Sequence, residues 1–213
     1  MKYNRQTPCV YHNIKVVFHG IPKNASTTIK NALYHLDTGE QFDNDNKQWI
    51  HKGNEKGGSE YPPIEEISTK YRPYKHLAVV RHPYERFISF YTDLVQRTAA
   101  HRFETPPFYT DNNLDITKFS VDQCIDMLDT YNDDQGDEHF ISQSSFIHND
   151  VLFYMQMNDL NNGWNSFCEF FSLSEVPLQH YNNSKGSIEL TQDQKDRLFN
   201  RYKTDFERFG YDR

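Results

Sequence analysis

The sequence has few positive charges and no long hydrophobic segment. Of its 213 residues, 23 are Lys or Arg and 30 are Asp or Glu, which gives a formal net charge of −7 with His neutral. General nucleic-acid binders are normally basic, so that class is disfavoured. The chain contains no apolar run of the ~18 residues that a transmembrane helix needs, and no signal-peptide core or membrane anchor. We therefore expect a cytoplasmic or otherwise soluble protein.

Cysteines are also few. Cys9, Cys124 and Cys168 are odd in number and widely spaced, without a C-x-x-C motif. This spacing predicts free thiols in a reducing compartment and indicates no metal site. Aromatic residues, in contrast, make up 15% of the chain and can supply much of a core. The length fits one domain, which we take as residues 1–213.

Two segments have the order strand, tight loop, helix. Residues 16–18 form a short β-branched and aromatic run, the turn signal Gly20-Ile21-Pro22 follows, and residues 25–36 carry apolar side chains at helical spacing. Residues 77–80 form a second apolar run, and a helix is expected from Pro83 to about residue 98. These units predict an α/β fold with a central parallel sheet flanked by helices.

The rest of the chain adds weaker signals. Residues 151–157 are a third strand candidate, and residues 191–209 form a tail helix opened by a capping box, Thr191 with Gln194. Residues 37–72 and 101–113 are polar and rich in turn formers, apart from one short helix near residues 64–68. We expect these loops to shape a substrate site.

The loop that follows the first strand carries groups that favour the binding of an anion. The start of a helix presents unused N–H groups and a positive dipole end. Lys23 adds a charge, and Ser26, Thr27 and Thr28 add three hydroxyl groups in the first turn. The loop is P-loop-like but no Walker A motif, because Pro22 stands where that motif has glycine. An ordinary helix cap with a solvated lysine remains the alternative.

The second loop also offers groups for an anion. Arg81 follows the strand of residues 77–80, at an edge where ligands bind in open α/β sheets. Ser89 lies further along the next helix and could donate to the same group. The alternative is that Arg81 pairs with Glu85 and that Ser89 only packs. Two such loops in one acidic protein suggest a ligand with two separated anionic groups.

Both loops resemble the motifs of the PAPS-dependent sulfotransferases (PAPS is 3′-phosphoadenosine 5′-phosphosulfate). Residues 22–28, PKNASTT, look like that family's 5′-phosphosulfate loop, and residues 80–91, VRHPYERFISFY, look like its 3′-phosphate motif. Residues 138–143, 177–184 and 202–211 are similar to later segments of the Golgi-type carbohydrate sulfotransferases and their soluble bacterial and viral relatives. The resemblance thus spans about residues 16–211.

This resemblance implies a reaction and a set of roles. The chain would transfer a sulfuryl group from PAPS to a hydroxyl acceptor, on a carbohydrate or small molecule, with PAP as the product and no metal. Lys23 would stabilise the leaving group, Arg81 and Ser89 would bind the 3′-phosphate, and Lys185 is a further candidate on the nucleotide side. The residues of the first loop would bind the 5′ side: Lys23, Asn24, Ala25, Ser26, Thr27 and Thr28.

The general base is open between His51, which we favour, and His139, with Glu55 as a third candidate. Two other functions remain as alternatives. One is a P-loop-type nucleotide kinase or NTPase, which would bind ATP and magnesium. The other is a non-catalytic protein that binds a nucleotide or a glycan.

Overall fold

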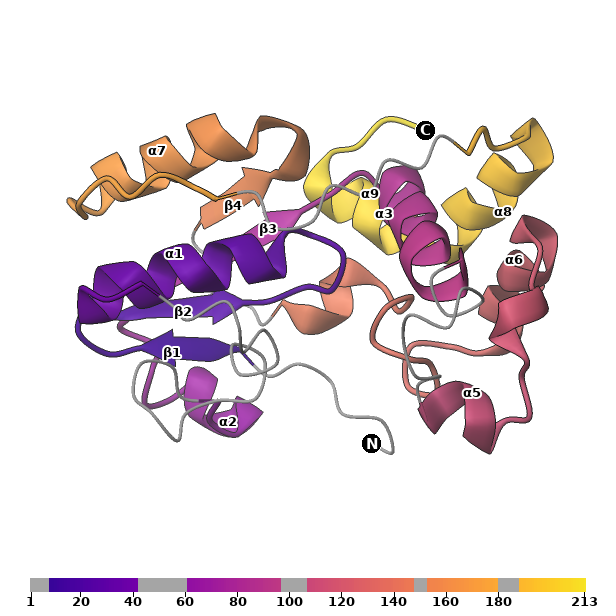
Figure 1. Ribbon diagram of the computed structural model, residues 1–213, viewed down its shortest axis with the longest axis horizontal. Coiled ribbons are helices and arrows are strands. Elements are labelled where there is room, and N and C mark those ends of the chain that lie inside the picture. The colour runs from indigo at the N-terminus through magenta and orange to yellow at the C-terminus, as the bar shows by residue number, and fades with distance from the viewer. Residues whose placement is uncertain (1–7, 42–60, 97–106, 148–152, 180–187) are drawn as a thin grey trace. The chain divides into compact units, whose positions relative to one another are not determined.

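The computed structural model describes residues 8–41, 61–96, 107–147, 153–179 and 188–213. The chain divides into two compact units. The sheet unit comprises Gln6–Val80 and Phe146–Asn183, and the helical unit comprises Met1–Arg5, Arg81–Ser145 and Ser184–Arg213. The positions of the two units relative to each other are not determined (Figure 1).

The sheet unit is built on four strands in the order β1-β2-β3-β4: β1 (Cys9–Tyr11), β2 (Val16–His19), β3 (Lys75–Val80) and β4 (Phe153–Gln156). β3 is parallel to both β2 and β4. The expectation of parallel strands is confirmed for these three, and the sequence analysis missed β1. β1 is antiparallel to β2 because only four residues connect them, too few for a parallel crossover.

Both faces of this sheet are covered. α1 (Ser26–Thr38) and α7 (Leu160–Phe170) lie on one face, and α2 (Ile64–Ile67) lies on the other (Figure 1). Side chains alternate along β2, so that Phe18 packs in the core with residues of α1 and α7, whereas Val17 packs with residues of and after α2. The sheet therefore has helices on both sides, as the sequence predicts.

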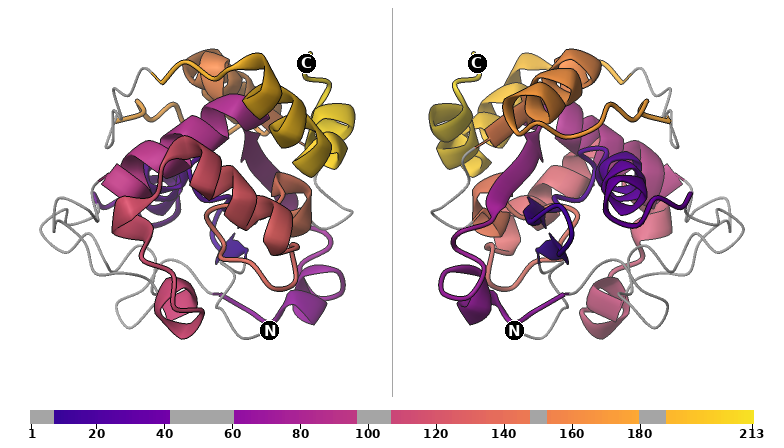
Figure 2. Two further views of the ribbon diagram at one scale, coloured as in Figure 1. Left: turned by 90° about the vertical axis from the view of Figure 1, so that its right-hand side faces the viewer. Right: turned by 90° about the vertical axis from the view of Figure 1, so that its left-hand side faces the viewer.

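The helical unit contains α3 (Pro83–Phe90), α5 (Pro107–Asp111), α6 (Val121–Thr130), α8 (Gln192–Arg201) and α9 (Lys203–Phe209). α8 lies beside α3 and α6 (Figures 1 and 2). Aromatic rings fill much of the core of the helical unit. The Phe140 ring lies 6.0 Å from Phe90 and 5.4 Å from Phe108 between centroids. These rings supply the core that the aromatic content of the sequence led us to expect.

Two predicted helices differ from the structure. The helix expected over residues 83–98 is α3 up to Phe90, followed by a π-helical segment, Tyr91–Gln96. The tail helix begins at the predicted capping box but is interrupted at Tyr202, between α8 and α9. The buried Tyr202 hydroxyl donates a hydrogen bond of 2.7 Å to the Phe140 carbonyl, a tertiary contact that helix propensity does not reveal.

Smaller differences lie in the loops. The segment expected as loop at residues 101–113 contains α5, while its first part lies outside the described residues. The short helix near residues 64–68 is confirmed as α2. Cys9, Cys124 and Cys168 are free and buried. In the described ranges, no helix is long and apolar enough to cross a membrane. The α/β fold class with a mostly parallel sheet is thus confirmed.

Candidate functional site

The first candidate loop joins β2 to α1 within the sheet unit. Two of its residues have left-handed backbone conformations, Lys23 with φ 71° and Ala25 with φ 52°. A turn closes inside the loop, where the Asn24 amide donates to the Ile21 carbonyl over 3.2 Å. Non-glycine residues adopt positive φ rarely and at a cost. The shape of this loop therefore costs conformational free energy at Lys23 and Ala25.

Asn24 fastens the loop to the sheet. Its side chain is fully buried, and Nδ2 donates a hydrogen bond of 2.9 Å to the Val79 carbonyl near the end of β3. The Ser26 hydroxyl donates to the Ile21 carbonyl over 2.6 Å. Since a serine hydroxyl has one proton, that proton is used inside the loop here. Asn24 and Ser26 therefore hold the loop in shape, while Lys23, Ala25 and Thr27 are partly exposed.

The start of α1 has the properties of an anion site. Ala25 is the N-cap residue and provides no side-chain cap, and the first turn contains no acidic residue. The helical hydrogen bonds begin with Ile29 donating to the Ala25 carbonyl over 3.1 Å, so the amides before Ile29 precede the ladder. This end of the 13-residue helix carries the positive end of the dipole without a carboxylate that would neutralise it.

Arg81 follows β3 directly and belongs to the helical unit. Its Nε lies 3.5 Å from a Glu85 carboxylate oxygen, so the pairing considered from the sequence is present but long. Burial lowers the pKa of Arg81, and the Glu85 charge opposes that shift. The guanidinium still stays charged at any ordinary pH. Arg81 thus places a permanent, largely desolvated cation at the beginning of α3.

Ser89 and Arg86 of the same motif are buried on α3, with 6% and 3% of their surfaces exposed. Arg86 donates to the Ile141 carbonyl over 2.7 Å and to the Glu138 carbonyl over 3.4 Å. Its burial also lowers its pKa. Arg86 therefore binds the segment of residues 138–141 to α3, a structural role within the motif.

His139 forms a pair with an acidic residue. Its Nδ1 lies 2.6 Å from Oδ1 of Asp137, which also accepts the His139 backbone N–H at 2.9 Å. The Asp137 side chain is 9% exposed and the His139 side chain 28% exposed. A carboxylate at Nδ1 favours the tautomer whose Nε2 carries the lone pair. This contact fixes the orientation of the His139 ring, and Asp137 is a partner that the sequence analysis missed.

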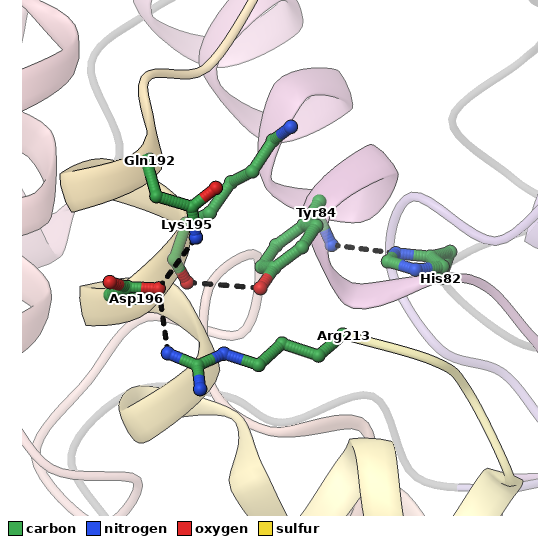
Figure 3. A pocket seen from close by; sticks show the side chains of 6 residues that line it. All are labelled: His82, Tyr84, Gln192, Lys195, Asp196 and Arg213. Atoms are coloured by element: carbon green, nitrogen blue, oxygen red, sulfur yellow. Dashed lines mark hydrogen bonds and ion pairs between the residues drawn. The ribbon is translucent and has the colours of Figure 1, made fainter.

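Both ring nitrogens of His82 take part in hydrogen bonds that hold the local structure. It is the N-cap of α3, where Nδ1 accepts from the Tyr84 amide over 3.3 Å, and its Nε2 lies 3.1 Å from the Asp212 carbonyl. It also lines a cavity of about 530 Å³ in the helical unit (Figure 3). The other residues of this cavity are Tyr84, Gln192, Lys195, Asp196 and Arg213.

The cavity does not contain the predicted site residues of its own unit, Arg81, Ser89 and His139. Asp196 and Arg213 form an ion pair of 2.6 Å, and Gln192 donates a further hydrogen bond to Asp196, as Figure 3 shows. The carboxylate thus cancels one of the cations.

The remaining candidates are placed as follows. His51, Glu55 and Lys185 lie outside the described residues. The residues of the first loop lie together in the sheet unit, and Arg81, Ser89 and His139 belong to the helical unit. Among the described residues, no group of three or more His, Cys, Asp or Glu side chains is placed to hold a metal ion.

Comparison with known proteins identifies the family. No curated protein and no solved structure matches the chain significantly. A model of the sulfotransferase family matches residues 9–212, which include both units and both candidate loops. The chain therefore belongs to the sulfotransferase family and is a transferase of sulfur-containing groups.

Proposed function

We propose that this protein transfers a sulfuryl group from PAPS to a hydroxyl group of a carbohydrate. Family membership implies the use of PAPS and of an acceptor. The carbohydrate is inferred from the resemblance of the later segments to carbohydrate sulfotransferases. The observation that carries the proposal is the uncapped, acid-free N-terminus of α1 behind the strained loop at Lys23 and Ala25.

These residues fit the 5′ end of the nucleotide. A phosphate or phosphosulfate at the start of α1 would meet the dipole, the early amides and the Thr27 hydroxyl. Lys23 is partly exposed beside them. We propose that Lys23 and Ala25–Thr28 bind this end, while Asn24 supports the loop from below through its bond to Val79.

The reaction needs three things from the protein. PAPS, when bound, supplies the sulfuryl group: the acceptor oxygen forms a bond to sulfur, the bond between sulfur and the bridging oxygen breaks, and PAP leaves. Negative charge then develops on the leaving phosphate, and Lys23 is the cation we assign to stabilise it. A base must take the acceptor proton, and the nucleotide must be held at its 3′ side.

For the base we retain two histidines. His51 is supported by the resemblance alone. His139 has structural support, because the contact between its Nδ1 and Asp137 favours the tautomer whose Nε2 carries the lone pair, as a general base needs. Replacing each by alanine separates them, since loss of the base should lower kcat by about 10²–10⁴-fold at an unchanged Kd for PAP. The histidine whose loss spares kcat is not the base.

For the 3′ side we propose Arg81 and Ser89, with Lys185 as a further contact. Arg81 is suited to a phosphate, because its fork of donors matches phosphate oxygens and its desolvation strengthens the interaction. Its contact with Glu85, at 3.5 Å and with the carboxylate 54% exposed, is weak enough for a phosphate to replace.

The first test measures ligand-induced stabilisation and turnover. We expect PAP to raise the melting temperature, since a ligand at about 100 times its Kd stabilises a fold by ~2.7 kcal/mol. ATP with magnesium serves as the comparison ligand. We also expect PAP release from PAPS in the presence of a suitable member of a carbohydrate acceptor panel.

Two variants sharpen this test. Lys23→Ala should lower kcat by at least about 10²-fold, as expected for loss of one charge-stabilising group. Lys70→Ala removes an exposed lysine of the same unit, which contacts Glu66 over 3.4 Å and the Tyr71 ring, and should leave kcat unchanged. A shift with ATP alone would favour the kinase alternative. PAP binding without turnover on any acceptor would favour the non-catalytic binding protein.

A further inference from the structure

One buried side chain holds both backbone groups of Arg81. The Arg81 amide donates to Oε1 of Gln143 over 3.0 Å, and Nε2 of Gln143 donates to the Arg81 carbonyl over 2.8 Å. Gln143 is fully buried. β3 ends at Val80 and α3 begins at Pro83, so Arg81 lies in neither a strand nor a helix. The glutamine amide thus serves Arg81 as a neighbouring strand would.

Gln143 is itself fixed from α9. Its backbone amide donates to Oδ2 of Asp205 over 2.8 Å. The amide and hydroxyl of Ser144 donate to Oδ1 of the same carboxylate over 2.9 and 2.7 Å. Asp205 is fully buried. A buried carboxylate with three such donors is strongly tied to its surroundings. The backbone of Gln143 therefore has little freedom.

We propose that Gln143 is a positioning residue that sets the backbone of Arg81 so that its guanidinium is presented to the 3′-phosphate of the nucleotide. This inference rests on the proposed function, in which Arg81 binds that phosphate. An arginine side chain is long, and its binding energy is reduced by every degree of freedom that must be frozen. Gln143 removes the backbone part of that cost before the ligand arrives.

The substitution Gln143→Met tests this role. Methionine has a similar length and can fill the same space, but it offers no donor or acceptor comparable to the amide. The readout is the ratio of Kd for adenosine 5′-monophosphate to Kd for PAP, which isolates the contribution of the 3′-phosphate. We expect this ratio to fall about tenfold, or about 1.4 kcal/mol, while Kd for the monophosphate changes less than about twofold.

The matched control is Gln194→Met. Gln194 is also buried, and its side chain also accepts from a backbone amide (Thr191, 3.0 Å), while its Nε2 donates to the Asp122 carboxylate over 2.7 Å. It belongs to the same helical unit but does not contact Arg81 through these bonds. We expect it to lower stability and leave the Kd ratio unchanged. If both variants lower the ratio equally, Gln143 has only a general structural role, and the proposal is wrong.

Failure of the proposed function gives a different result. If Arg81 does not bind a 3′-phosphate, the parent protein itself shows no preference for PAP over the monophosphate. If the parent has the preference and folded Gln143→Met retains it, only the positioning role is overturned.

Amide hydrogen exchange of the parent protein provides a readout that does not depend on the variant folding. The proposal requires the Arg81 amide to be protected before PAP is added, with little further gain on binding. An Arg81 amide that exchanges freely until PAP binds would show that the ligand, and not Gln143, orders this residue.

Discussion

At the residue scale, isolated polar side chains in buried places decide the local geometry. Asn24 ties the first loop to β3, and Asp205 organises the start of the segment that carries Gln143. Asp133, which is half-buried, acts in a similar way: it accepts from the Ser142 amide over 3.2 Å and from the Ser145 hydroxyl over 2.7 Å. Each replaces backbone pairing where the chain is irregular, because buried backbone groups need partners.

Asp133 makes the stability of the helical unit sensitive to acid. Burial alone would raise its pKa, but the charge of Arg201 and the hydrogen bonds from Arg201, Ser142 and Ser145 outweigh burial and lower the pKa. A carboxyl group whose pKa is lowered on folding stabilises the protein above its unfolded pKa of ~3.9. That stabilisation is lost as the pH falls through the lower, folded pKa.

Urea unfolding between about pH 6 and pH 2 measures this effect. We expect Asp133→Asn to be less stable than the parent at pH 6 and the difference to shrink as the pH falls. The exposed neighbour Asp134 provides the control, since Asp134→Asn should keep the parental pH dependence. A difference between Asp133→Asn and the parent that is constant with pH would mean that the charge of Asp133 is not what stabilises the unit.

At the element scale, α1 is a core helix whose N-terminus we propose as the binding site of the 5′-phosphate. Ordinary helices of this length often begin with a side-chain cap and acidic residues. The N-termini of α1 and α7 have neither, whereas α6 and α8 each begin with a complete capping box. The helix start that we assign to an anionic ligand thus lacks both kinds of stabilisation.

Thr27→Asp tests whether the absence of an acidic residue from the first turn of α1 favours the binding of the nucleotide. The new carboxylate should stabilise α1 by about 0.3–1 kcal/mol through the helix dipole. We expect the same change to weaken PAP binding at least tenfold, because it places a negative charge where the 5′-phosphate would bind. Urea unfolding and calorimetric titration measure the two effects.

The neutral variant Thr27→Asn is the control for Thr27→Asp. It retains a polar side chain of similar size without the charge, so PAP binding should weaken only by the loss of the Thr27 hydroxyl contact and much less than in Thr27→Asp. If Thr27→Asp is more stable and binds PAP as well as the parent does, this helix start is an ordinary one and the nucleotide binds elsewhere.

At the scale of the whole molecule, the three cysteines report on the cores of both units. Cys9 and Cys168 belong to the core of the sheet unit, and Cys124 is buried in the helical unit. Burial raises the pKa of Cys124 to about 12 and that of Cys168 to about 11, and it also raises that of Cys9. All three therefore remain protonated thiols at neutral pH.

Thiol labelling tests the integrity of both cores. Since the thiolate is the reactive form, we expect no rapid labelling by a disulfide reagent at pH 8 in the native protein, and three labelled thiols in denaturant. Added PAP should slow the labelling further if the nucleotide stabilises the native state. A native thiol that reacts as fast as a free one would contradict the burial found here.

The sequence by itself determined the strands β2 and β3, the starts of α1, α3 and α8, and the two loops that we propose for nucleotide binding. These features depend on neighbouring residues, and local periodicity and capping encode them. The tertiary structure decided the direction of β1 and the interruption of the tail helix at Tyr202. It also decided the pair of hydrogen bonds between the Gln143 side chain and the Arg81 backbone, which are 62 residues apart. Hydrogen bonds between residues so far apart leave no periodic pattern in the sequence, because only the folded chain brings the two partners together.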